Sequence, residues 1–122
     1  MNMDSALKEA MKIGGAIGVA LVDSETGLCL GTLGGGNLDL SLAAAGATDV
    51  VRSKMRTIES LCLDDSIVDV LITLEKQYHL IRLLRNPRNG SGLFLYLVLD
   101  RATANLGWAR HHLSRIEGQI VV

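Results

Sequence analysis

Aromatic residues, proline and cysteine are all scarce in this chain of 122 residues. Aromatic side chains account for 3% of it, so aliphatic residues and alanine must form the core. The two cysteines, Cys29 and Cys62, have neither the close spacing of zinc ligands nor the number expected of a secreted disulfide scaffold. We therefore expect two reduced, mostly buried thiols and no metal site.

The sequence also lacks an excess of charge of either sign and a long apolar run. Its 12 basic and 13 acidic residues give a formal net charge of -1, which argues against nucleic acid or an anionic membrane surface as a partner. No apolar run approaches the roughly 18 to 20 residues of a membrane span, and Asp4 and Glu9 stand where a secretory signal would be basic and then apolar. We expect a cytoplasmic protein with a single domain over residues 1–122.

Apolar periodicity divides the chain into helix, strand, strand, helix, strand, strand, strand and helix. In the first strand, Ile17, Val19 and Leu21 should point one way and the small residues between them the other, which leaves a face on which a helix can pack closely. The helices are expected at residues 4–13, 38–63 and 102–120, and the strands at 16–23, 28–33, 67–74, 78–85 and 93–100.

The long central helix carries more apolar surface than one sheet can cover. One continuous stripe at helical spacing consists of Leu40, Ala44, Ala47, Val51, Met55, Ile58 and Cys62. A second, shorter apolar face lies off that stripe, and the strand that follows lacks the lysine or proline that usually protects a sheet edge. These features predict a homodimer that continues one sheet across a twofold axis and packs the long helices together. The expected interface residues are Leu38, Leu42, Ala45, Asp49, Val68, Val70 and Ile72.

The glycine-rich stretch GTLGGGNLDL, residues 31–40, raises the question of a phosphate-binding loop. A Walker loop needs Lys and Ser or Thr at the start of the following helix, and a dinucleotide loop needs G-x-G-x-x-G directly after a strand in a βαβ unit. Neither pattern is present. We expect a flexible connector in which Asn37 caps the helix, and no cofactor.

Other polar residues give no pattern of catalytic or metal-binding chemistry. His111 and His112 are adjacent, so on a helix they point about 100° apart, whereas two histidine ligands on one helix sit three or four residues apart. His79 has no partner by spacing, Asp64 and Asp65 are typical of a solvated helix break, and Asp69 is expected to face solvent or to deter misregistered pairing. No catalytic residue is predicted. The only proline, Pro87, begins a segment whose Asn89 and Gly90 indicate a turn.

Three stretches resemble the roadblock family, which includes the roadblock-type dynein light chains and bacterial regulators of small Ras-like GTPases. These stretches are GVALVDSETGLCLGT, AAAGATDVVRSKMRTIESL and LFLYLVLDRATANLGWARHHLSRIE, in which Asn105, Leu106, Gly107 and Arg110 are similar to the closing-helix pattern. The resemblance covers about residues 5 to 118. It implies an α+β sandwich of the roadblock/profilin-like type, with a five-stranded antiparallel sheet in the order 2-1-5-4-3. The long helix would cover one face and the other two helices the opposite face, and the third strand and second helix would form a homodimer interface.

The same resemblance implies a non-enzymatic protein without a cofactor that binds a small Ras-like GTPase and modulates its GTP hydrolysis or nucleotide exchange. Arg52 and Arg56, on the polar side of the long helix, are the residues to test for this partner, although ordinary solvated charge explains them better than a catalytic role does. One alternative is a structural adaptor of the dynein light-chain type, which links proteins without affecting nucleotide turnover. A small enzyme or ligand sensor is a third, and it would need a polar pocket.

Overall fold

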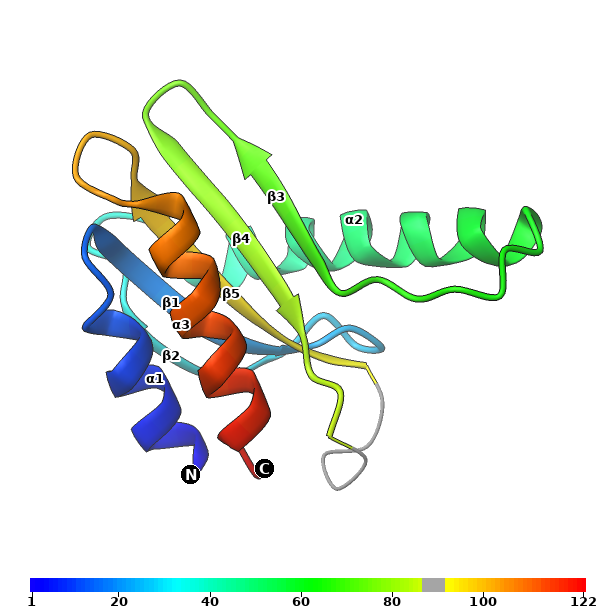
Figure 1. The fold of residues 1–122 in the computed structure, drawn as a ribbon, viewed down its shortest axis with the longest axis horizontal. Coiled ribbons are helices and arrows are strands. Elements are labelled where there is room, and N and C mark those ends of the chain that lie inside the picture. Colours follow the sequence, from blue (N-terminus) through cyan, green and yellow to red (C-terminus); the bar gives the residue numbers. More distant parts are fainter. Residues whose placement is uncertain (87–91) are drawn as a thin grey trace.

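The computed structural model describes residues 1–86 and 92–122, and in that part of the chain it contains three helices and five strands in the predicted order (Figure 1). Pro87, Asn89 and Gly90, for which a turn was predicted, lie outside the described residues. The helices are α1 (Met3–Met11), α2 (Leu40–Ser60) and α3 (Leu106–Gln119). The strands are β1 (Ala16–Asp23), β2 (Cys29–Gly34), β3 (Asp69–Thr73), β4 (Gln77–Leu83) and β5 (Leu93–Asp100).

The strands form one antiparallel sheet in the order β2-β1-β5-β4-β3, which confirms the expected topology. Strand β5 lies at the centre, and all six of its residues from Phe94 to Leu99 are buried, because helices cover both of its faces. Strands β2 and β3 are the two edges. Their unpaired backbone groups are the positions at which another strand can add to the sheet.

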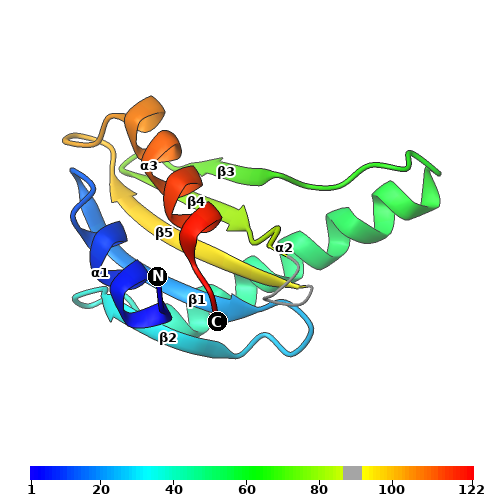
Figure 2. The same ribbon diagram turned by 60° about the horizontal axis from the view of Figure 1, so that its bottom comes forward.

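Helices α1 and α3 pack on one face of the sheet and α2 on the other, as expected (Figures 1 and 2). Alternation along β1 and β5 supplies both layers, since Val19 and Leu97 point toward α1 and α3 while Ala20 and Tyr96 point toward α2. Ile17 was predicted to share a face with Val19, but it packs on the α2 side. The register between β1 and β5 shifts between Ala16 and Gly18, so the simple alternation is broken there.

Side-chain caps fix where the helices begin. The Asp39 carboxylate accepts a hydrogen bond from the Leu42 N–H at 3.1 Å, so the cap of α2 is Asp39 rather than the predicted Asn37, and the helix starts at Leu40 instead of residue 38. In α3 the Asn105 side chain accepts from the Trp108 N–H at 2.9 Å. The prediction that this helix starts near residue 102 is wrong, because Asp100 holds the intervening residues in a turn through the backbone N–H groups of Ala102 and Ala104.

Two of the strands differ in length from the prediction. Strand β3 covers Asp69–Thr73 rather than residues 67–74, and β4 begins at Gln77 and ends at Leu83 rather than covering 78–85. The glycine-rich stretch begins inside β2 and continues as a connector in which Gly34, Gly35 and Gly36 have φ of +71°, +103° and +54°. Such angles favour glycine, and they allow the chain to leave the sheet edge and cross to the α2 face.

Candidate protein-interaction surface

The apolar stripe of α2 is covered by the sheet along only half of its length. Leu40, Ala44, Ala47 and Val51 are buried, whereas the exposed fraction of Met55 is 44%. Figures 1 and 2 both show the second half of α2 continuing past β3 and away from the strands. We call this second half together with the segment that returns to β3, residues 52–68, the overhang. Because it leaves its own sheet, Cys62 is exposed, contrary to the expectation of a buried thiol.

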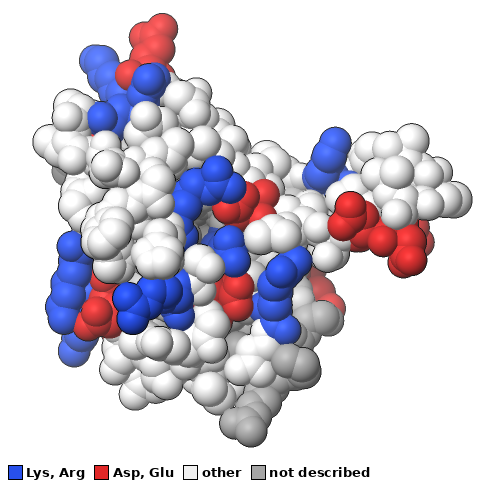
Figure 3. All heavy atoms as spheres, viewed as in Figure 1, with Lys and Arg blue, Asp and Glu red and all other residues white. Residues whose placement is uncertain are grey.

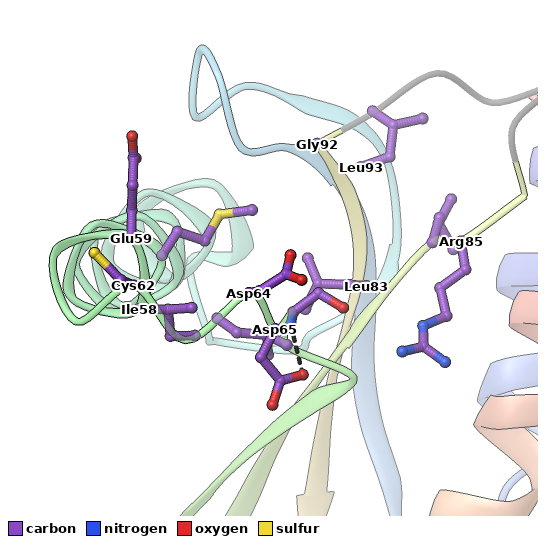
Figure 4. Close-up of a pocket in the computed structure, with 13 residues that line it drawn as sticks. Ile58, Glu59, Cys62, Asp64, Asp65, Leu83, Arg85, Gly92 and Leu93 are labelled. Atoms are coloured by element: carbon purple, nitrogen blue, oxygen red, sulfur yellow. Dashed lines mark hydrogen bonds between the residues drawn. The ribbon is translucent and has the colours of Figure 1, made fainter.

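Two hollows lie between the overhang and the body of the protein. The larger has a volume of about 620 Å³, and Figure 4 shows α2 on one side of it and the ends of β4 and β5 on the other. The second, of about 470 Å³, separates Val50, Lys54 and Ile58 of α2 from the start of β3. Apolar side chains thus face open space on both sides of these hollows. The larger hollow is lined by Met55, Ile58, Glu59, Cys62, Asp64, Asp65, Ser66, Ile67, Leu83, Leu84, Arg85, Gly92 and Leu93.

The acidic residues in the larger hollow belong to the end of the helix. Asp65 accepts a hydrogen bond from the Ser66 N–H at 2.8 Å, and both Cys62 and Asp64 have positive φ, which ends α2 and turns the chain back (Figure 4). Among residues 1–86 and 92–122, no three His, Cys, Asp or Glu side chains gather into a group that could hold a metal ion.

The edge strand β3 presents apolar side chains beside the overhang. Val68 has 38% of its surface exposed, and Val70 and Ile72 are half-buried. Within the described residues β3 pairs only with β4, so its outer side has no strand partner. The interface residues predicted from this strand therefore lie at an open edge of the sheet.

Asp69, the single charge of β3, does not face solvent as predicted. Its side chain is 14% exposed and receives hydrogen bonds from the Arg110 guanidinium of α3 at 2.8 to 3.1 Å. Arg82 of β4 lies 3.7 Å from the same carboxylate and donates to Glu117 at 3.3 Å. Figure 3 shows this mixture of positive and negative side chains on the α1–α3 side of the molecule. The only charge of β3 is thus neutralised on the α3 face and is kept off the open edge.

The α2 residues predicted for the dimer interface lie away from β3. Leu42, Ala45 and Asp49 are exposed, and the rotation of about 100° per residue places them on the outer surface of the helix, opposite the buried stripe. The part of α2 next to β3 carries Val50 instead. Leu38 was predicted to lie on the helix, but it precedes the cap and packs against the core beneath α2.

Arg52 and Arg56, predicted as partner-binding residues, are both exposed on α2. They line a shallow hollow with Ser24 and Glu25 of the β1–β2 turn, on the side of the helix away from β3. Neither guanidinium has an ion-pair partner among the described residues. Their charge is therefore available to an acidic partner.

A polar chain that sequence reasoning did not identify lies on the α2 face of the sheet. The Tyr96 hydroxyl of β5 lies 2.7 Å from Nδ1 of His79 in β4, and Nε2 of His79 lies 2.9 Å from Oε1 of Gln77. Burial lowers the pKa of His79 below its usual 6.5 and raises the pKa of Tyr96 to about 12. Hydrogen bonding between residues 17 positions apart leaves no local signal in the sequence. His111 and His112 lie elsewhere, on α3.

No helix among the described residues is long and apolar enough to span a bilayer. No protein-family model matches the sequence, and no curated protein matches it in a sequence comparison.

Solved structures share the fold at low sequence identity. A Roadblock/LC7 domain from Streptomyces avermitilis superposes with a TM-score of 0.79 and 13% identity, over 97% of this chain and 93% of that one. The gliding protein MglB from Thermus thermophilus gives 0.77 and 19%, over 93% of this chain and 82% of that one. An MglB with a tetrameric arrangement gives 0.76 and 18%, over 93% and 81%. The chain therefore has the roadblock fold that the sequence resemblance implied.

Proposed function

We propose that this roadblock-fold chain forms a homodimer that binds a small Ras-like GTPase and modulates its GTP hydrolysis or nucleotide exchange, and that it catalyses no reaction itself. The GTPase part of this proposal rests on the resemblance of the sequence to the roadblock family and on the shared fold. Such a partner would place the protein in the cytoplasm.

The proposal of a homodimer is supported by two uncovered apolar surfaces, one on α2 and one on β3, that could cover each other. The second half of α2 presents Met55 and Ile58 without a sheet beneath them, and the open edge of β3 presents Val70 and Ile72. A twofold axis beside β3 would pair the two edges and lay each overhang on the other protomer's sheet. Both surfaces would then be buried in one interface, and the sheet would continue without an exposed apolar edge. The tetrameric MglB of the same fold supports self-association.

The outer surface of α2 is the surface we assign to the GTPase. It would stay exposed in this dimer, because the interface uses β3 and the stripe on the inner side of the helix. Leu42, which has 71% of its surface exposed, supplies an apolar contact, and Arg52 and Arg56 supply positive charge that forms no ion pair within the described residues. Arginine is enriched at protein interfaces relative to the rest of the surface.

The test uses the small GTPase encoded nearest to this gene. Its affinity for the purified protein and its single-turnover rate of GTP hydrolysis are measured with wild type and with the double variant Arg52→Glu, Arg56→Glu. We expect the wild type to bind and to change the rate, and we expect the charge reversal to weaken binding by about tenfold, as for two partly exposed ionic contacts. The control Arg115→Glu on α3 reverses a single exposed charge on the opposite side of the sheet and should leave binding unchanged.

The outcomes separate the candidate functions. Binding without any change in hydrolysis or exchange would favour an adaptor that links proteins. Absence of binding to that GTPase, or equal weakening by Arg115→Glu, would contradict the surface assigned here.

A further inference from the structure

The polar chain of Gln77, His79 and Tyr96 fixes the protonation state of its histidine. Gln77 Oε1 can only accept a hydrogen bond, so Nε2 of His79 carries the proton that it donates at 2.9 Å. In the neutral ring Nδ1 is then bare and accepts from the Tyr96 hydroxyl at 2.7 Å. With the imidazole uncharged, both ring nitrogens and the Tyr96 hydroxyl proton have hydrogen-bond partners.

Protonation of His79 would break this arrangement. Nδ1 would gain an N–H that donates to the Tyr96 oxygen, so the hydroxyl proton of Tyr96 would lose Nδ1 as its acceptor. Tyr96 is 3% exposed, and its hydroxyl has no other hydrogen-bond partner within the described residues, so it would have to turn its proton into the core. With a pKa of about 12, the Tyr96 hydroxyl keeps its proton at neutral and mildly acidic pH. An unpartnered buried donor costs about 1–3 kcal/mol.

The polar chain of Gln77, His79 and Tyr96 lies beside the proposed dimer contact. His79 is the direct cross-strand neighbour of Ile72 in β3, so the two side chains share one face of the sheet, the face on which Tyr96 packs. The principal contacts of α2 are with β1 and β2, and His79 and Ile72 remain only half-buried. The dimer described above would lay the second copy's overhang over this part of the sheet and complete their burial.

We propose that His79 makes the homodimer sensitive to protons, with the neutral ring favouring the dimer and the charged ring opposing it. This inference rests on the homodimer of the proposed function.

The groups around His79 give a protonated ring no counter-charge. They are the Tyr96 hydroxyl from β5, the Gln77 amide from β4 and the Ile72 side chain from β3, and no described carboxylate pairs with the ring. On its own α2, the cation Lys54 lines a hollow with Asp69 and Val70 of β3. The second copy's overhang would bring Lys54 and Glu59 beside its apolar stripe, and it also carries Arg52, Arg56, Asp64 and Asp65.

The direction of the effect follows from burial. Burial lowers the pKa of His79 below 6.5, so its contribution to folding is complete above that pH and is lost as the pH falls from 6.5 through the lowered value. Association would lower the pKa further, so the dimer should weaken as the pH falls through the lowered value of the folded monomer. A further pKa decrease of one unit on association, at each of the two His79 rings in the dimer, corresponds to about a hundredfold change in the dissociation constant once the pH lies below both pKa values, and to a smaller change at a pH near them.

The test is sedimentation of the full chain at pH 7.5 and pH 5.5, with circular dichroism at both values to verify folding. We expect the dimer dissociation constant of the wild type to rise by about tenfold at pH 5.5. His79→Gln, which keeps a neutral acceptor for Tyr96 but cannot titrate in this range, should give one dissociation constant at both values. The matched control replaces the other two histidines, His111→Gln with His112→Gln, and should keep the wild-type response.

Each outcome decides a different point. A dimer whose affinity does not change with pH, or a response that His79→Gln retains, would overturn the proton sensitivity and leave the homodimer standing. A monomer at pH 7.5 would overturn the homodimer and this inference with it. If His79→Gln does not fold, Tyr96→Phe takes its place: it removes the hydroxyl that conflicts with protonation, and the response should shrink to about threefold or less. An undiminished response would contradict the role of Tyr96.

Discussion

The two halves of α2 carry the same apolar stripe, but they have different surroundings. From Leu40 to Val51 the stripe lies on the sheet and is buried. From Met55 onward it continues at the same spacing with hollows beneath it, where the helix has passed β3 (Figure 2). Periodicity in a sequence thus identifies a face to be covered, but it does not say which chain covers it.

Residues in the covered half of α2 stabilise the fold, whereas residues in the uncovered half serve association. Burial within one chain contributes to the free energy of unfolding, whereas a surface left open contributes only when a partner covers it. Substitutions in the two halves of α2 should therefore differ in which measurement they change.

The largest effect is expected in the covered half. Val51 is fully buried on the side of α2 that faces the sheet, so Val51→Asp would place an unpaired carboxylate in the core and lower the free energy of unfolding by about 4 kcal/mol or more. Urea denaturation followed by circular dichroism measures this loss. A variant of near wild-type stability would show that the first half of α2 is not held on the sheet as described.

A smaller effect of a different kind is expected in the uncovered half. Ile58→Asp adds the same charge to the same stripe, but next to a hollow, and should change the free energy of unfolding by less than about 1 kcal/mol. The dimer dissociation constant should instead rise by about tenfold or more, which sedimentation measures.

Ile72→Lys at the β3 edge is the matched variant for the other side of the same interface, and it should weaken the dimer similarly. An intact dimer in both variants would contradict the proposed pairing of edge and overhang. A large loss of stability in Ile58→Asp would remove the distinction between the two halves.

The smallest effect is expected from Gly46, which lies in the covered half but on the exposed side of the helix. A Cβ at this position would meet nothing within 4 Å. Gly46→Ala should raise the free energy of unfolding by about 0.5–1 kcal/mol, because alanine loses less backbone entropy in a helix. Thermal unfolding measures the gain. A weaker dimer in this variant would place Gly46 in a close helix–helix contact.

The elements of the fold could be predicted well from local pattern. Strand β5 was predicted at its observed bounds, Leu93–Asp100, and the sheet order followed from the family resemblance. The ends of α2 and α3 were less accurate, because the caps are single side-chain hydrogen bonds and Asp39 competes with Asn37 on equal chemical terms. At the candidate surface, Val70 and Ile72 were predicted to lie at a sheet edge. The open stretch of α2 at Met55 was instead predicted to continue the stripe that packs on the chain's own sheet.

Interactions between residues far apart in the sequence could not be predicted. Asp69 meets Arg110 across 41 positions, and Tyr96 meets His79 across 17. In each case the separate residues have ordinary explanations, a charge on a strand or a tyrosine in a core. Only the packing of α3 on the sheet, and the register of β4 against β5, brings the partners within hydrogen-bond distance.

Local pattern was enough to locate the helices and strands and to identify their apolar faces, because backbone periodicity and side-chain hydrophobicity are local properties. Three features arise only when the elements pack together: half of the α2 stripe has no cover, the charge of β3 pairs with α3, and His79 meets Tyr96 beside the open edge. These facts depend on where the long helix crosses the sheet. The crossing is set by the packing of all the elements together, and no single segment encodes it.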